Sequence, residues 1–141
     1  MTTSTATKIK KHPDKAKLDD FIQKCRDSVK NQIAEFKASK LHPNGYYYSD
    51  LTGYKIINSR KAQCNHVIPF RELVYNFIRS RNIDLNDIDS LPESELTAIL
   101  KDFAAHHERV AVLNILTESE NKRDFYTNRE KFRHWTEFYT N

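Results

Sequence analysis

The sequence has few cysteines and no long apolar run. Its 141 residues include two cysteines, which is too few for a disulfide framework or a four-cysteine zinc site. No stretch reaches the ~20 consecutive apolar residues that a membrane-spanning helix needs. Residues 1–11 contain no apolar segment of the kind found in secretory signals. We therefore expect an intracellular, cytoplasmic protein that has no membrane partner.

The charge balance is mildly basic. Lysine and arginine together number 23 against 19 acidic residues, so the formal net charge is +4. A positive charge leans towards a polyanionic partner such as nucleic acid. On charge alone, however, the net positive charge is better explained by solvated lysines on a soluble protein than by a nucleic-acid partner.

The spacing of apolar residues indicates one domain that is largely helical. Residues 1–13 are rich in Thr and Lys and predict a disordered basic arm, and residues 14–141 predict a single domain with its core at about 46–126. Apolar residues at three- and four-residue steps predict helices over 14–40, over 70–82 and from about 93 to 107. The pattern Thr117-Glu118-Ser119-Glu120 is typical of a capping box and predicts another helix start.

Short β-strands are expected between the first two helices. Residues 46–48 and 54–57 flank a turn that ends at Gly53, and a third strand-like run, 62–68, ends at Pro69. This region is typical of β-hairpins. Residues 110–116 fit a short strand or a helix continuation equally well. The expected fold class is therefore α+β.

Several polar side chains suit phosphodiester hydrolysis. His66 ends a strand-like run beside Asn65, while Asn121 opens a helix and is followed by Lys122 and Arg123. A histidine, with an unperturbed pKa of about 6.5, accepts protons near neutral pH. Amide oxygens bind hard cations, and basic side chains hold phosphate. Taken singly, His66 is better explained as a strand histidine in a core hydrogen bond, whereas Asn121 is explained about equally well as a surface amide or as a metal ligand.

Four segments, in order, make the chain similar to the HNH endonuclease family, in particular its small phage and mobile-element members. Together they cover residues 46–123. The second segment matches the family's Asp-His-hydrophobic-hydrophobic-Pro-Phe block, and the fourth looks like its terminal asparagine block. The four segments are Leu51-Thr52-Gly53, Asn65-His66-Val67-Ile68-Pro69-Phe70, His107 with Ala111 and Leu113, and Asn121-Lys122-Arg123.

The resemblance implies a ββα-metal core with additional N-terminal and C-terminal helices, and metal-dependent cleavage of double-stranded DNA. His66 would be the general base, and Asn65 and Asn121 would hold one Mg²⁺ or Mn²⁺ ion. His107 would be a further catalytic residue, as would Asn121 through its metal. Cutting of both strands would suggest a homodimer. The residues expected to contact nucleic acid are Arg60, Lys61, Lys122 and Arg123.

The first departure from the family pattern concerns the metal. Asn65 stands where the family usually has aspartate, and loss of that charge should weaken metal affinity. Asn65 would then be either a ligand or a structural hydrogen-bonding residue that leaves Asn121 as the sole protein ligand.

Two further departures concern the base and zinc. The family's middle asparagine, which orients the base, has no clear match. Its expected place falls near Val112, with Asn114 close by, and His106 or His107 could substitute. Where many relatives carry a cysteine pair, this chain has none, so no structural zinc is expected. The residues in that place are Thr117 and Glu120.

Two other classes of function stay open. The replacement of an acid by Asn65 would also suit a DNA-binding protein on a decayed nuclease scaffold. Alternatively, the chain is a helical protein that binds a protein partner, and its basic charge is incidental. Convergence of Asn65, His66 and Asn121 in space would favour the nuclease.

Overall fold

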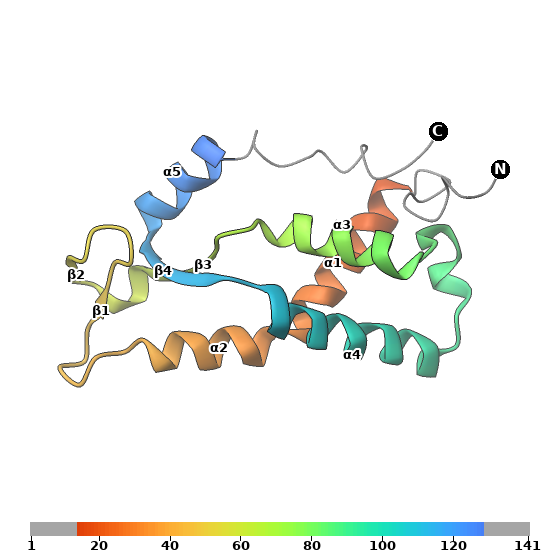
Figure 1. Cartoon of the computed structure of the whole chain (residues 1–141), viewed down its shortest axis with the longest axis horizontal. Helices are drawn as coiled ribbons and strands as arrows, with labels where there is room; N and C mark the ends of the chain where they lie inside the picture. Colours follow the sequence, from red (N-terminus) through yellow and green to blue (C-terminus); the bar gives the residue numbers. More distant parts are fainter. Residues whose placement is uncertain (1–13, 129–141) are drawn as a thin grey trace. The chain divides into compact units, whose positions relative to one another are not determined.

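The computed structural model describes residues 14–128 (Figure 1), and within that range the chain has an α+β fold. The basic arm expected at 1–13 and the last part of the expected domain, 129–141, lie outside it. The described residues divide into two compact units. A helical unit contains 14–29 and Phe70–Val110, and a sheet unit contains Lys30–Pro69 and 111–128. In sequence, the second segment of the helical unit therefore interrupts the sheet unit.

Three α-helices and a 3₁₀ helix make up the helical unit. They are α1 (Lys15–Ser28), α3 (Phe70–Arg81), the 3₁₀ helix Leu85–Ser90 and α4 (Glu93–Val110). α1 packs against both α3 and α4. The apolar stripe predicted for 70–82 is confirmed. The stripe predicted for 14–40 is confirmed only as far as Val29, because Ile33 and Phe36 are half-buried. The buried residues are Leu18, Phe21, Ile22 and Cys25 on α1, and Leu73, Val74, Phe77 and Ile78 on α3.

The expected continuous helix over 14–40 is wrong, since the chain breaks at Val29 into α1 and α2 (Lys30–Ser39). The Ser28 hydroxyl donates a hydrogen bond of 2.7 Å to the carbonyl of Cys25. A serine that bonds back to the preceding turn competes with the backbone ladder and bends helices. The Val29 N–H closes the turn onto Arg26 and Asp27. The apolar stripe runs across this break, which explains why periodicity alone missed it.

The sheet unit begins with the expected hairpin. β1 (Tyr47–Tyr48) and β2 (Lys55–Ile56) pair antiparallel. Gly53 lies in the turn between them with a φ of 78°, a left-handed conformation that glycine adopts without steric cost. The hairpin prediction is confirmed for these two strands.

The third strand does not extend that hairpin. β3 (Ala62–His66) pairs antiparallel with β4 (Leu113–Thr117), with Asn65 opposite Asn114. The partner strand comes 49 residues later, and in Figure 1 the two strands run side by side. Residues 110–116, which suited either a helix or a strand, therefore contribute a strand.

The β3–β4 pair has one apolar face. Side chains alternate along a strand, so Ala62 and Cys64 share a face, and Ile115 lies opposite Cys64. This face packs against the buried Ile56 of the hairpin and against half-buried Phe36 of α2. The other face of β3 carries Gln63 and Asn65, and α5 (Glu118–Asn128) packs against both strands.

The capping box predicted at Thr117 is confirmed. The Thr117 N–H donates to Glu120 Oε1 at 2.9 Å, and the Glu120 N–H donates to Thr117 Oγ1 at 3.1 Å. The buried Ser49 hydroxyl also donates to Glu120, at 2.9 Å. Burial by itself raises the pKa of Glu120, but the hydrogen bonds from Thr117 and Ser49 and the charge of Arg123 outweigh it, so the pKa is lowered. This carboxylate ties the start of α5 to the hairpin turn.

Among the described helices, none combines the length and the apolar character that crossing a bilayer requires.

Replacing Glu120 with alanine is expected to lower the free energy of unfolding by about 2 kcal/mol, because the helix start loses its cap and Ser49 keeps a buried hydroxyl without its acceptor. Urea denaturation at neutral pH measures the change. Glu35→Ala removes an equal charge from an exposed position of the same unit and serves as control. Equal effects of the two substitutions would contradict the capping role.

The stabilisation by Glu120 should also depend on pH. Since its folded pKa lies below the ordinary value of 4.5, the contribution is complete above that value and is lost as pH falls through the lowered pKa. The stability difference between the wild type and Glu120→Gln should therefore narrow in acid. Urea midpoints measured from neutral pH downward test this. A difference that widens in acid would have the wrong sign.

Candidate active site

Four amide side chains gather between the β3–β4 pair and α5. Gln63 and Asn65 are two residues apart on β3 and so share a face, and Asn114 lies directly opposite Asn65 on β4. Asn121 reaches this face from α5, where its Nδ2 donates to Gln63 Oε1 at 2.7 Å. We call these four half-buried residues the amide cluster. Two of them, Asn65 and Asn121, are the predicted metal ligands.

The hydrogen bonds of the amide cluster orient its amide groups. Asn65 Nδ2 donates to Asn114 Oδ1 at 3.1 Å, and Asn121 donates through its nitrogen to Gln63. Both bonds use amide nitrogens, so the Oδ1 atoms of Asn65 and Asn121 stay available as acceptors. Amide oxygens are ligands for hard cations such as Mg²⁺, and the cluster fits such an ion in this respect.

The cluster lacks the charge of a typical magnesium site. Within residues 14–123, no three His, Cys, Asp or Glu side chains gather closely enough to hold a metal ion. A cation at Asn65 and Asn121 would therefore be held by neutral oxygens, with less electrostatic attraction than a carboxylate supplies.

His66 lies on the opposite face of the strand. It is the last residue of β3 and is half-buried, and pairing continues one step further, where the Val67 N–H donates to the carbonyl of Val112 at 2.8 Å. Alternation along a paired strand turns His66 towards the face of Cys64 and away from Asn65. The predicted base is thus adjacent to the amide cluster in sequence but does not share its face.

His107 is a core residue of the helical unit. Only 1% of its surface is exposed, and its ring centroid lies 6.0 Å from that of Phe70 and 6.2 Å from that of Phe103. Burial, followed by the charge of His106, lowers its pKa, so the imidazole is neutral near pH 7. Packing in the core explains this residue, and we leave it out of the proposed site.

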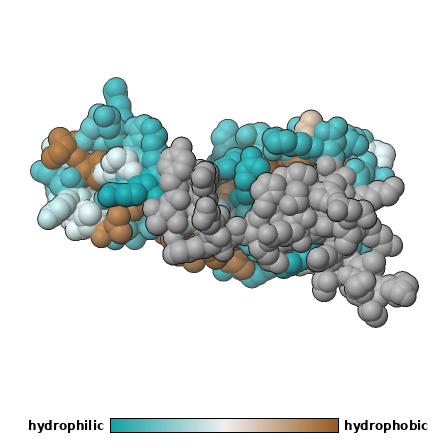
Figure 2. All heavy atoms as spheres, turned by 90° about the horizontal axis from the view of Figure 1, so that it is seen from above, coloured by the Kyte–Doolittle hydropathy of each residue, from teal (hydrophilic) through white to brown (hydrophobic). Residues whose placement is uncertain are grey.

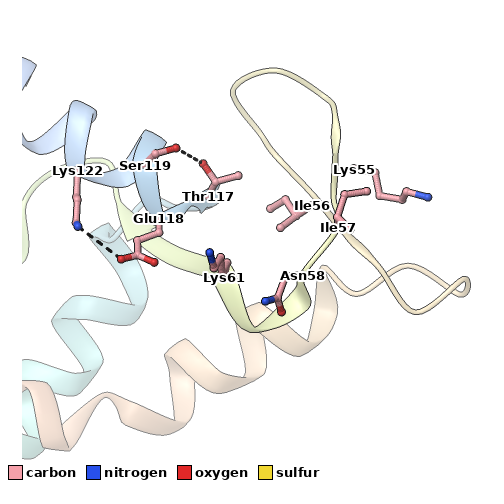
Figure 3. A pocket seen from close by; sticks show the side chains of 9 residues that line it. All are labelled: Lys55, Ile56, Ile57, Asn58, Lys61, Thr117, Glu118, Ser119 and Lys122. Atoms are coloured by element: carbon pink, nitrogen blue, oxygen red, sulfur yellow. Dashed lines mark hydrogen bonds and ion pairs between the residues drawn. The ribbon is translucent and has the colours of Figure 1, made fainter.

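A cleft next to the amide cluster contains two of the predicted nucleic-acid contacts. Lys61 is the last residue of the 3₁₀ helix Ser59–Lys61, and Lys122 lies on α5. In Figure 3 both side chains border the same space, whereas the ammonium group of Lys55 points away from it, over the ring of Tyr46 at 4.4 Å. The cleft, called here the lysine cleft, has a volume of about 520 Å³ and is lined by Lys55, Ile56, Ile57, Asn58, Lys61, Thr117, Glu118, Ser119 and Lys122.

The other two predicted nucleic-acid contacts are exposed neighbours of the cleft residues. Arg60 precedes Lys61 and Arg123 follows Lys122, but neither lines the cleft. Within the cleft, Lys122 Nζ lies 3.5 Å from a carboxylate oxygen of Glu118.

Sequence reasoning missed Gln63 and Glu118 altogether. Gln63 is two residues before Asn65, so strand alternation alone could have put it on the same face. Asn114 was noted only as a neighbour of the expected position, because its role depends on pairing with a distant strand. Glu118 sits four residues before Lys122, a spacing at which helical side chains meet.

Comparison of this chain with protein-family models, with curated proteins and with solved structures gives no match.

Proposed function

We propose that this protein is a divalent-metal-dependent, HNH-type DNA endonuclease that hydrolyses phosphodiester bonds with His66 as general base. One observation carries the proposal. The strand that ends in Asn65 and His66 pairs with β4, and β4 runs directly into the helix that carries Asn121. A strand, strand, helix order supports the proposed ββα-metal core, although His66 lies on the first strand rather than the second and residues 70–110 separate the two strands. Asn65 and Asn121 lie on the face of β3 against which α5 packs.

The amide cluster would hold the ion. Asn65 and Asn121 would bind one Mg²⁺ or Mn²⁺ through their Oδ1 atoms, while Asn114 and Gln63 restrain their amide groups through the hydrogen bonds described above. When bound, the cation would stabilise negative charge on the scissile phosphate and the leaving oxygen.

His66 would take a proton from the attacking water. Because the His66 and Asn65 side chains leave β3 in opposite directions, a phosphate that contacts both would have to lie at the end of the strand, where His66 is the last residue. The cations Lys61 and Lys122, with their exposed neighbours Arg60 and Arg123, would hold phosphates on either side.

The second candidate is a DNA-binding protein that does not cut. Two observations favour it, namely the neutral amide cluster and the orientation of His66 away from Asn65. It would use the same cations, so its binding would weaken as salt rises.

Replacing His66 with alanine is expected to slow DNA cleavage by at least ~100-fold, because proton abstraction from water loses its base. Supercoiled plasmid incubated with Mg²⁺, Mn²⁺ or EDTA measures nicking and linearisation. His42→Ala, an exposed histidine of the same unit, is the control. Both variants should keep the gel shift of the wild type.

Three outcomes of this assay separate the candidates. If His66→Ala cuts as fast as the wild type, His66 is not the base. If the wild type shifts DNA but never cuts it, the DNA-binding candidate is correct. If it neither binds nor cuts, the basic charge is incidental and a protein partner becomes the better hypothesis. Linearisation rather than nicking by the wild type would point to two copies acting together.

Restoring the acid should strengthen metal binding. Asn65→Asp adds a carboxylate to the amide cluster and is expected to lower the Mg²⁺ concentration for half-maximal cleavage roughly tenfold, or by ~1.4 kcal/mol. Asn121→Ala should raise that concentration. The matched control is Asn31→Asp, on the exposed surface of α2. A response of Asn65→Asp no larger than that of Asn31→Asp would remove Asn65 from the ligand set.

A further inference from the structure

We propose that the lysine cleft binds one nucleotide of a DNA strand, and that its phosphate replaces the Glu118 carboxylate as the partner of Lys122. This inference rests on the proposed action on DNA and adds a contact that neither the amide cluster nor His66 supplies.

The cleft has the size and lining for a nucleotide. Its volume of about 520 Å³ lies within the range of pockets that hold small ligands. One side carries the ammonium groups of Lys61 and Lys122, the hydroxyls of Thr117 and Ser119 and the carboxylate of Glu118, and the other side carries Ile56 and Ile57 with the amide of Asn58 (Figure 3). A phosphate suits the first side, and a sugar or base suits the second.

One of the two isoleucines that line the cleft is largely exposed. Ile57 leaves 76% of its surface uncovered, although it lines the cleft. Hydrophobic atoms also interrupt the hydrophilic surface over the part of the chain that carries β1 and β2 (Figure 2). An exposed isoleucine beside two cations offers a nucleotide an apolar contact together with charge neutralisation, a combination that solvated lysines alone would not provide.

Glu118 occupies the position that an anion would take. Its carboxylate oxygen is 3.5 Å from Lys122 Nζ, and both side chains are about half exposed or more, at 48% and 70%. Charge-assisted hydrogen bonds are shorter, and exposed pairs of this kind are weak. Lys61 has no salt-bridge partner among the described residues. A phosphate in the cleft would therefore displace a loosely held carboxylate and gain a second cation.

The cleft and the amide cluster draw on neighbouring residues of the same two segments. Lys61 ends the 3₁₀ helix two residues before Gln63, and Lys122 follows Asn121 on α5. Each of these two short segments, 61–63 and 121–122, thus supplies one residue to the cleft and one to the amide cluster. A strand that crosses the amide cluster would place a neighbouring phosphate at the cleft.

Substitutions that remove a negative or a positive charge from the cleft should change DNA affinity in opposite directions, and this tests the proposal. Affinity for fluorescently labelled duplex DNA is measured by anisotropy in EDTA, where no cutting occurs. Glu118→Gln should raise affinity roughly two- to fivefold, because the carboxylate no longer competes. Lys61→Ala and Lys122→Ala should each lower affinity and reduce the slope of log affinity against log salt by about 1.

Matched controls distinguish an effect of the cleft on DNA affinity from an effect of net charge. Glu35→Gln and Lys30→Ala make the same charge changes at exposed positions on α2 of the same unit. In a Lys122→Ala background, Glu118→Gln should lose most of its effect. The proposal is overturned if Glu118→Gln does no more than Glu35→Gln, or if its gain persists without Lys122. Thermal unfolding of each variant should match that of the wild type.

Two further arms identify the ligand and separate this proposal from the nuclease. An unlabelled mononucleotide should compete far more weakly than unlabelled duplex. Equal competition would make the cleft a site for free nucleotides and overturn the assignment to a strand. If the protein does not cleave DNA but Glu118→Gln still raises DNA affinity, hydrolysis is rejected and nucleotide binding in the cleft is supported. If the protein cleaves DNA but Glu118→Gln leaves DNA affinity unchanged, only the proposal of nucleotide binding in the cleft is rejected.

Discussion

The register between β3 and β4 is the constraint on which the candidate site depends. It sets Asn65 opposite Asn114 and Cys64 opposite Ile115, so one face is apolar and the other carries amides. A slip of one residue would exchange the two faces. Asp50 holds β4 from its other edge, where its N–H donates to the carbonyl of Ile115 at 2.8 Å and its Oδ2 accepts from the Ile115 N–H at 2.6 Å. The hairpin turn thereby helps to position the distant strand.

The second constraint is the helix start. Once β4 is in register, Thr117 ends it, and Glu120 caps the helix that follows while bonding Ser49. The end of β4 and the Glu120 cap therefore determine where α5 starts and in which direction it runs, within a few residues of the amide cluster. Asn121 follows Glu120 directly, so its contact with Gln63 depends on the same buried carboxylate. Stability and geometry of the site thus share one interaction.

Local features of this sequence were predictable, and distant pairings were not. The buried stripes of α1 and α3, the turn at Gly53 and the capping box at Thr117 are each encoded within a few neighbouring residues. The pairing of Asn65 with Asn114 joins segments 49 residues apart, and no local pattern records it. The spacing that suggested a catalytic role for His107 is equally that of a helix face buried against Phe103. The break at Val29 was missed because the apolar stripe crosses it.

Because strand pairing is not visible in the sequence, only some of the site residues could be predicted from it. Asn65, His66 and Asn121 stand in recognisable motifs, so they were named from the sequence. The role of Asn114 becomes visible only when β3 lies beside β4. Gln63 and Glu118 lie at local spacings from Asn65 and Lys122, but neither stands in a motif that marks it. These three residues determine how the named ones are oriented or paired.

In the two proposed functions, the distribution of charge would separate binding of DNA from its cleavage. The amide cluster carries no formal charge, while the adjacent cleft carries lysines and a single carboxylate. Affinity for a polyanion would then come mainly from the cleft and its arginine neighbours, because phosphate contacts dominate such binding. The amide cluster would contribute little until a cation joins it. If the proposed function is correct, the chain would keep its affinity for DNA while its capacity for hydrolysis changed through one residue, Asn65. The two candidate functions therefore differ in chemistry at one face of β3 and share a single surface for binding.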